Sequence, residues 1–386
     1  MRVEQIGSIE RADEAAWRAL EPRDFPFFDL EFLCALERSG SIGPGSGWEP
    51  LYLACRDEKD GGGLLGVLCL YLKTDSYGEY IFDWEWARAY ERHGLQYYPK
   101  LVAAVPFTPA TGPKLLVRPD VSENPATRAA VTRALLEAAQ SLGEELRASS
   151  SHALFLPEAE LEAFEQRGFT VRHSLQFHWR NRNYEAFSDY LGALTSKRRR
   201  QIKRERLQLE GEGLIVERLT GEALDKDRAA AMYRFYVGTF DRKWGFPYLN
   251  EAFFYEVFET MGNRLLLVLA RDELSRLPVA GALFFFKGGS LYGRYWGAAE
   301  KRQNLHFELC YYQGIEFAIE RRLALFEAGA QGEHKLARGF LPSLTYSAHH
   351  IRHPAFRRAI EHYIAEEKEM LAGAMAEYAR HDPYKR

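Results

Sequence analysis

The chain has 386 residues, of which 46% are hydrophobic and 27% charged, and 51 Lys and Arg residues nearly balance 54 Asp and Glu residues at a net charge of −3. This length suggests roughly two to three domains, and the hydrophobic fraction excludes an extensively disordered chain. The charge balance excludes a uniformly basic protein that coats nucleic acid, and it excludes an acidic solvating tail.

The cysteines and the N-terminal segment point to a reducing compartment. The four cysteines are scattered without a C-x-x-C pair, which is typical of neither a disulfide framework nor a zinc site. The first residues carry charges throughout and lack the apolar region of a signal peptide. No apolar run approaches the roughly 18 residues of a membrane-spanning helix. We therefore expect a cytoplasmic protein.

The first half of the chain predicts a hairpin, a third strand, a helix and a fourth strand. Residues 51–73 read as strand, charged turn and strand, and 100–107 as a further strand that runs into a loop rich in proline. Residues 126–146 predict a helix that starts after Asn124-Pro125, and 152–157 predict the strand that follows.

The second half repeats this order. The ranges 265–287, 290–298, 306–323 and 325–330 predict the hairpin, strand, helix and strand again, and 354–380 predict a long amphipathic helix. Two unrelated hairpins can look alike, but the shared order of elements favours an internal repeat. Matching residues in the two hairpins are Leu53-Ala54 with Leu269-Ala270 and Arg56-Asp57-Glu58 with Arg271-Asp272-Glu273.

The repeat predicts an α/β (α+β) fold of two tandem units, each a mostly antiparallel sheet flanked by helices. We expect an N-terminal domain over residues 1–190 and a C-terminal domain over residues 191–386. The second domain would open with a basic helix and end with the long helix.

The basic helix is predicted over residues 196–206, where seven of eleven residues are Lys or Arg. Ser196 is suited to cap this helix, yet the first turn carries cations, which the helix dipole disfavours. A bound phosphate of a nucleotide, coenzyme A or RNA would offset that repulsion. The alternative is a solvated face paired with acids elsewhere. The candidate phosphate-binding residues are Lys197, Arg198, Arg199, Arg200 and Lys203.

Four stretches, residues 76–116, 281–298, 305–319 and 326–351, resemble the FemAB-like branch of the GNAT-type N-acyltransferases, and in particular its peptidoglycan biosynthesis/recognition group. The resemblance implies a tandem GNAT-like fold and transfer of an acyl or aminoacyl group to an amine. It implies acyl-CoA or aminoacyl-tRNA as the donor, without a tightly bound cofactor. The acceptor would be a small-molecule or peptide amine, such as a peptidoglycan precursor.

One departure from the GNAT pattern concerns the loop that binds the coenzyme A pyrophosphate. Residues 300–308 contain no glycine, and residues 106–114 contain one glycine and three prolines. Proline removes N–H donors, so neither loop is a convincing phosphate nest. This weakens acyl-CoA as the donor and leaves room for tRNA or for phosphate binding by the basic helix.

Amide formation requires a base for the amine, a stabilised oxyanion and alignment of donor with acceptor. Glu333 and His334 follow two glycines that allow tight turns, and a histidine beside a carboxylate suits a base near neutral pH. Tyr346 is suited to donate a proton. The predicted catalytic residues are therefore Glu333, His334 and Tyr346. The alternative is a charged surface loop with a packed aromatic side chain.

Predicted substrate-binding residues are spread along both halves. The rings of Trp84 and Tyr98 suit a sugar or an acyl chain, although they also fit an aromatic segment that merely covers the sheet. Arg294 and Trp296 alternate along one strand and share a face. Eleven histidines lack metal-ligand spacing, so no metal site is expected. The full set is Asp83, Trp84, Tyr98, Lys100, Arg294, Trp296, Lys335, Arg338 and His349.

Two other functions are compatible with these features. The absence of a glycine-rich loop allows a degenerate transferase that binds a cell-wall fragment or nucleotide without chemistry. The basic segment alone allows RNA binding, which a steep salt dependence would reveal.

Overall fold

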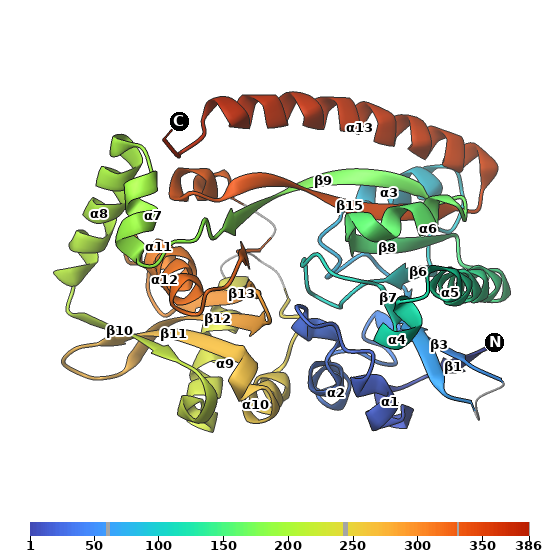
Figure 1. Ribbon diagram of the computed structural model, residues 1–386, viewed down its shortest axis with the longest axis horizontal. Helices are drawn as coiled ribbons and strands as arrows, with labels where there is room; N and C mark the ends of the chain where they lie inside the picture. The colour runs from blue at the N-terminus through green and yellow to red at the C-terminus, as the bar shows by residue number, and fades with distance from the viewer. Residues whose placement is uncertain (59–61, 242–245, 330–331, 386) are drawn as a thin grey trace. The chain divides into compact units, whose positions relative to one another are not determined.

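A computed structural model gives the fold and describes residues 1–58, 62–241, 246–329 and 332–385. The chain divides into two compact units. Unit 1 comprises Met1–Pro22, Phe27–Leu175 and Leu344–Ala374, and unit 2 comprises Arg23–Pro26, Gln176–Ser343 and Met375–Arg386. Each unit contains a mostly antiparallel sheet flanked by helices, which confirms the predicted fold class (Figure 1). No helix of the described residues is long and apolar enough to cross a membrane.

Unit 1 has two sheets, with strand orders β1-β3-β4-β7 and β15-β8-β6-β5-β2. Its strands are β1 (Arg2–Ile6), β2 (Trp48–Pro50), β3 (Tyr52–Arg56), β4 (Leu64–Leu68), β5 (Leu70–Lys73), β6 (Lys100–Ala103), β7 (Leu115–Val117) and β8 (Ser150–Leu156). Its helices are α1 (Glu14–Arg18), α2 (Leu30–Arg38), α3 (Trp84–Arg92), α4 (Pro119–Ser122), α5 (Pro125–Glu145) and α6 (Leu161–Glu165). Strands β9 (Thr170–Arg180) and β15 (Leu341–Ile351) and helix α13 (Pro354–Arg380) contribute residues to both units.

Helix α5 forms the core of unit 1 for reasons visible in its sequence. The Asn124 side chain accepts hydrogen bonds from the first amides of the helix, and Pro125 occupies its first turn, as predicted. Val131, Leu135 and Ala139 recur every four residues and pack into the buried cluster of the sheet.

Unit 2 has the strand order β10-β11-β12-β13-β14-β9. Figure 1 shows α12 on one side of its central strands and α9 and α10 on the other. Its strands are β10 (Leu214–Leu219), β11 (Leu265–Asp272), β12 (Pro278–Lys287), β13 (Ser290–Ala298) and β14 (Leu325–Glu327). Its helices are α7 (Phe187–Ala193), α8 (Ser196–Glu210), α9 (Lys226–Asp241), α10 (Glu251–Thr260), α11 (Leu305–Phe307) and α12 (Gln313–Glu320), with a π-helical segment at Glu308–Tyr312 and a 3₁₀ segment at Glu333–Arg338.

The predicted repeat is confirmed in the order of elements. In unit 1 the parallel strands β6 and β8 are joined by α5, and in unit 2 the parallel strands β13 and β14 are joined by the helical segments over 305–320. The two strands that end these crossovers share a further feature. Phe155 and Gly329, each two residues beyond the last parallel pair, both have positive φ, and both carbonyls accept a hydrogen bond from a lysine ammonium.

Close packing of α9 on β13 gives a first prediction. A Cβ atom at Gly297 would lie 1.9 Å from the carbonyl oxygen of Phe235, a backbone atom that cannot move aside. We expect Gly297→Ala to lower the free energy of unfolding by about 3 kcal/mol, measured by urea denaturation. Gly192→Ala in α7 is the matched control, because nothing lies within 4 Å of the added Cβ there. Equal stabilities of the two variants would contradict the packing.

Candidate active site

Unit 2 contains a cavity of about 400 Å³ where two parallel strands separate. The pairing of β13 with β14 runs from Ser290↔Leu325 to Tyr292↔Glu327. Beyond it, residues 293–296 of β13 and 328–329 after β14 line the cavity. Arg294 is an extra residue in the register between β12 and β13, and such a bulge bends its strand. The bend therefore helps to open the cavity and to carry Arg294 and Trp296 into its wall.

A π-helical turn supplies the opposite wall. The helix over residues 305–320 widens at Glu308–Tyr312, and His306, Cys310 and Tyr311 line the cavity. π-Bulges of this kind often occur at functional sites because they redirect side chains. The sequence gives no signal for this turn, so Tyr311 was not among the predicted site residues.

His334 and Tyr311 form the polar pair of the cavity. The Tyr311 hydroxyl lies 2.8 Å from His334 Nε2. Partial burial, with the charges of Arg338 and Lys335, lowers the pKa of His334 below its ordinary value. Burial raises the pKa of Tyr311. At neutral pH the pair is therefore a neutral imidazole beside a protonated phenol, which suits proton transfer. The side chain of Glu333, predicted beside His334, lies outside the described residues.

Lys335 and Arg338, predicted to bind substrate, are buried and turn toward the protein. Lys335 Nζ donates to the Gly329 carbonyl at 2.6 Å, and burial lowers its pKa to about 8. Arg338 donates to the His334 carbonyl at 2.8 Å and to the Glu205 carboxylate at 2.8 Å. These bonds fix the loop that carries His334. Glu205, on α8, also went unrecognised in the sequence, since a glutamate within a basic helix reads as an ordinary surface charge.

In unit 1 the equivalent position is filled. Loop 106–114 is largely buried, with Phe107 and Ala110 at 4% and 3% exposure. The Lys114 ammonium, itself buried, donates to the carbonyls of Gly112 and Phe155 at 2.6 and 3.0 Å. The splay of β6 and β8 is thus occupied by the chain's own residues, whereas that of β13 and β14 is open. This favours unit 2 as the unit that performs chemistry.

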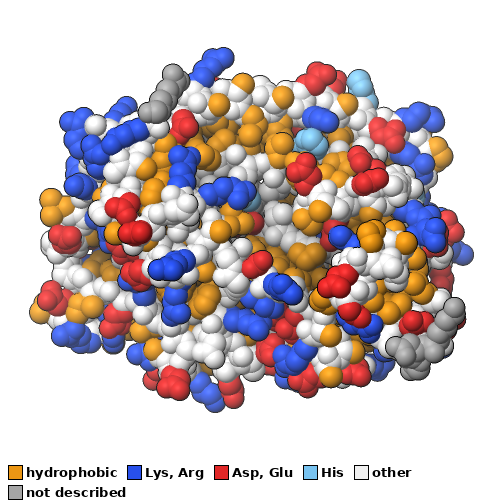
Figure 2. Space-filling model, in the orientation of Figure 1, with side chains coloured by type: hydrophobic (Ala, Val, Ile, Leu, Met, Phe, Trp, Pro, Cys, Tyr) orange, Lys and Arg blue, Asp and Glu red, His pale blue; other side chains and the backbone are white. Residues whose placement is uncertain are grey.

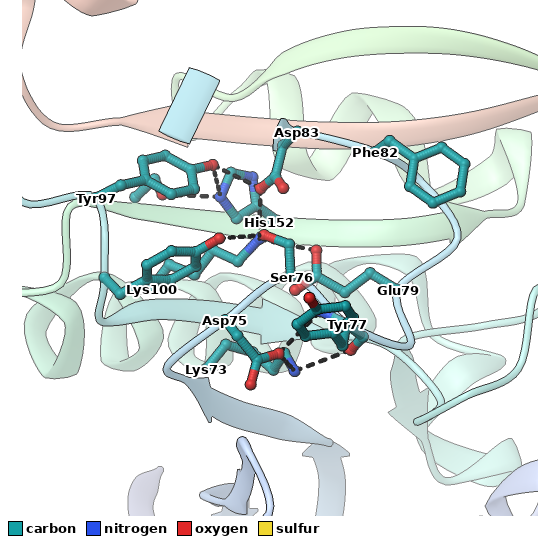
Figure 3. Close-up of polar contacts among 12 residues, drawn as sticks. Lys73, Asp75, Ser76, Tyr77, Glu79, Phe82, Asp83, Tyr97, Lys100 and His152 are labelled. Atoms are coloured by element: carbon teal, nitrogen blue, oxygen red, sulfur yellow. Dashed lines mark hydrogen bonds and ion pairs between the residues drawn. The ribbon is translucent and has the colours of Figure 1, made fainter. Parts of the chain in front are cut away.

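Unit 1 instead holds a buried polar cluster, drawn in Figure 3, around the ammonium of Lys100. Lys100 is 0% exposed and forms ion pairs with Glu79, at 2.8 Å, and with Asp83, while Ser76 accepts a further hydrogen bond at 2.8 Å. Burial raises the pKa of Glu79 to about 7 despite Lys100. Burial also acts to raise the pKa of Asp83, but Lys100 outweighs it and holds that pKa at about 2. Asp83 and Lys100, both predicted to bind substrate, therefore form an ion pair with each other in the interior of unit 1.

The predicted ring residues Trp84 and Tyr98 lie elsewhere on unit 1, on a second cavity of about 640 Å³. Its wall combines α3 with the segment before β6. Because α3 is helical, Trp84 faces the cavity and Trp86 points into the core at 5% exposure. The lining residues are Trp84, Ala87, Arg88, Glu91, Leu95, Tyr97 and Tyr98.

His349, a predicted substrate residue, pairs with His152 in the core of unit 1. Their Nδ1 atoms lie 2.7 Å apart, and the two Nε2 atoms each meet a serine hydroxyl, of Ser347 and Ser150, at 2.8 Å. One Nδ1 must carry a proton and the other must accept it, so the two rings hold opposite roles. Tyr346, a predicted catalytic residue, is on the same strand, packs against His173 and belongs to unit 1, whereas His334 belongs to unit 2.

This pair gives a pH prediction. Burial lowers the pKa of His152 to about 3, from 6.5 when exposed. Between these values the unfolded chain binds the extra proton, so the pair's contribution to stability is present above pH 6.5 and is lost as pH falls. We expect the free energy of unfolding of the wild-type protein to fall by about 2 kcal/mol more between pH 7.5 and pH 5 than that of His152→Asn. Urea denaturation at the two pH values measures both losses. His381→Asn, at an exposed position, is the control, and its stability should change with pH as that of the wild type does. An equal loss of stability in all three proteins would refute the prediction.

Helix α8 carries the predicted phosphate-binding cations. Lys197, Arg200 and Lys203 are exposed, and Figure 2 shows Lys and Arg side chains gathered where Figure 1 draws α8. Arg198 and Arg199 are half-buried and bond to Gln201 and Ser196. Within the described parts of the chain, none of these five cations pairs with a carboxylate. The expected cap at Ser196 is wrong, because Thr195 occupies the N-cap position and makes no side-chain cap bond.

The C-terminal half of α8 is tied to the loop before α11. Gln208 donates to Gln303 at 3.1 Å and accepts from Asn304 at 3.0 Å. The exposed Lys301 lies in this loop. A basic helix and a cationic loop that leads into the cavity-lining helix are therefore parts of one surface of unit 2.

Comparisons with known proteins agree with this fold. Residues 8–386 match the FemAB-like family described as peptidoglycan biosynthesis/recognition. No curated protein sequence matches the chain. Solved structures of similar fold include FemX (13% identity, TM-score 0.54, covering 94% of this chain and 100% of that one). A lysylphosphatidylglycerol synthetase C-terminal domain from Agrobacterium fabrum, named as putative, gives 10% identity and a TM-score of 0.54 over 92% and 95% of the chains. L-PGS from Bacillus licheniformis gives 11% identity and a TM-score of 0.50, and the match covers 86% of this chain and 95% of that one.

Proposed function

This chain belongs to the FemAB-like family of peptidoglycan biosynthesis/recognition, and we propose that its unit 2 transfers an acyl or aminoacyl group to an amine. The observation that carries the proposal is the cavity at the splay of β13 and β14, which the His334–Tyr311 pair lines together with the part of β13 beyond its pairing with β14. Backbone amides on the open side of a strand are donors suited to a developing oxyanion, and the histidine is a base.

The reaction step follows from these groups. The amine nitrogen attacks the acyl carbonyl carbon, a C–N bond forms, and the C–O bond of an ester or the C–S bond of a thioester breaks. His334 accepts the proton that the amine loses, and the Tyr311 hydroxyl relays a proton to the leaving oxygen or sulfur. Because the pKa of His334 lies below its ordinary value and that of Tyr311 above, both start in the required form near pH 7.

For the donor we propose an aminoacyl-tRNA, with acyl-CoA as the alternative. The loop 300–304 offers Lys301 and no glycine, and the neighbouring α8 presents Lys197, Arg200 and Lys203, none of which pairs with a carboxylate in the part of the chain that the structure describes. This surface suits a polyphosphate backbone better than one pyrophosphate. The names of FemX and the lysylphosphatidylglycerol synthetases among the similar folds accord with aminoacyl transfer. The family description supports a peptidoglycan precursor as the acceptor amine.

A direct transfer assay tests the proposal. Purified protein is offered a mixture of aminoacyl-tRNAs, or separately acyl-CoAs, with a peptidoglycan-precursor peptide that bears a free amine, and the amide product is sought by mass spectrometry. Product that depends on His334 supports the proposal. A yield no higher than that of the His334→Ala variant with every donor would overturn it and favour a binding module.

The charges on α8 give a prediction for the donor. The triple variant Lys197→Gln, Arg200→Gln, Lys203→Gln should weaken tRNA binding and lower the slope of log affinity against log salt by about 2 to 3. Filter binding across a salt series measures both. Arg228→Gln is the control, since Arg228 pairs with Asp225 within its own helix region. An unchanged slope in the triple variant would exclude α8 as the tRNA contact.

A further inference from the structure

We propose that the aromatic cavity of unit 1 binds a carbohydrate chain, whose pyranose rings stack on Trp84 and Tyr98. The cavity measures about 640 Å³, within the range of small-molecule sites. It lies on α3 and the segment before β6, whereas the proposed transfer chemistry lies in unit 2, so this inference does not depend on the proposed function.

The rings are accessible and extend beyond the cavity itself. Trp84 and Tyr98 are half-buried, and Tyr77, with 59% of its surface exposed, packs edge-on against Trp84 at 5.1 Å between ring centroids. Phe82, on the same loop, is 54% exposed. Rings that lie side by side and stay accessible, as Tyr77 and Trp84 do, suit a binding surface.

The buried cluster explains why these rings hold their orientation. Ser76 accepts a hydrogen bond from Lys100 and its hydroxyl meets that of Tyr98, both at 2.8 Å. Asp83 accepts from the Tyr97 hydroxyl at 2.6 Å, and the same carboxylate pairs with Lys100. Figure 3 shows Ser76 and Asp83 at the Lys100 ammonium, and the Tyr97 hydroxyl at Asp83. The buried Lys100 ammonium thus fixes Tyr98 through Ser76 and Tyr97 through Asp83. These bonds pre-organise the wall of the cavity.

The loop that carries Tyr77 is fixed in the same way. Lys73 Nζ is buried and donates to the Tyr77 carbonyl at 3.1 Å and to Asp75 at 3.2 Å. Asp75 in turn accepts from the Tyr77 amide at 2.8 Å. Tyr77 is therefore held at the surface by a buried lysine instead of folding into the core.

The chemistry of the wall favours a sugar over an acyl chain or an organic cation. Arg88 and Glu91 on α3 place a charged donor and acceptor beside the rings, which suits equatorial hydroxyls and not a hydrocarbon tail. The Lys100 ammonium lies 5.4 and 5.8 Å from the centroids of Tyr97 and Tyr98, so a cation of the protein already lies over one face of each ring. A pyranose, with C–H groups on its face and hydroxyls on its rim, matches a flat ring beside polar side chains.

Titration of the full-length protein with oligosaccharides tests the inference. Tri-N-acetylchitotriose and maltotriose are the probes, followed by calorimetry and by tryptophan fluorescence, with no acyl donor present. We expect saturable binding of at least one probe. Trp84→Ala and Tyr98→Ala should each weaken it at least about fivefold, whereas Tyr98→Phe, which keeps the ring, should retain most of it. Phe246→Ala, at a ring 86% exposed in unit 2, is the control and should bind as wild type.

Three outcomes would overturn the inference. The first is no saturable binding of either saccharide by the wild-type protein. The second is binding that the two alanine variants leave unchanged. The third is dodecanoate binding that Trp84→Ala abolishes while the saccharides do not compete, which would assign the cavity to an acyl chain. Because no donor is added, each result stands apart from the success or failure of the transfer assay.

Discussion

His334→Gln is expected to lower the rate of amide formation by about 10² to 10⁴ while leaving the fold intact. Glutamine keeps a polar group within reach of the Tyr311 hydroxyl, which now lies 2.8 Å from the imidazole, but it cannot accept a proton at neutral pH. Single-turnover kinetics with a pre-charged donor measures the step itself, so that product release does not mask the loss. Tyr311→Phe removes only the hydroxyl that relays a proton, so it should lower the rate of amide formation less than His334→Gln does.

The pH profile separates a base from a merely structural histidine. Because the pKa of His334 lies below its ordinary value, the acidic limb of kcat/KM should have its midpoint below pH 6.5, and it should disappear in His334→Gln. His381→Gln, at an exposed position, is the control and should keep the limb. A limb that survives in His334→Gln would assign the proton transfer to another group.

The order of elements could be read from the sequence because it rests on local patterns. The paired hairpins, the capped start of α5 at Asn124-Pro125 and the long helix from Pro354 each depend on residues close together in the chain, and all three are confirmed.

The composition of the candidate sites could not be read in this way, because it depends on contacts between distant residues. His152 and His349 are 197 positions apart, and nothing near either residue indicates the other. Arg338 was predicted to bind substrate, but its carboxylate partner is Glu205, which lies 133 positions away in the chain. Tyr311 reaches the cavity only through a π-helical turn, which has no sequence signature. Residue type alone therefore suggested His334 but not its partner.

Lys100→Met is expected to destabilise the protein by about 3 to 5 kcal/mol, because it leaves buried carboxylates without their cation. Lys100 is 0% exposed, and Glu79 and Asp83 are 4% and 3% exposed, so water cannot replace the lost ion pairs. Urea denaturation at pH 7.5 measures the loss. Lys368→Met, at an exposed lysine of α13, is the matched control and should change stability little.

The cause of that loss can be separated from lost packing by neutralising the partners. If uncompensated charge is responsible, the triple variant Lys100→Met, Glu79→Gln, Asp83→Asn should be more stable than Lys100→Met alone. In Lys100→Met the carboxyl groups are expected to have pKa values above those of the unfolded chain, since burial acts without its counter-charge. Their contribution is then fully present at low pH and is lost as pH rises, so Lys100→Met should be closer to wild type at pH 5 than at pH 8. The opposite outcome is a loss of stability that is the same at both pH values and in the triple variant. It would show that Lys100 contributes through its methylenes alone. Its ammonium would then not organise the loop that carries Tyr77 or the rings of the aromatic cavity.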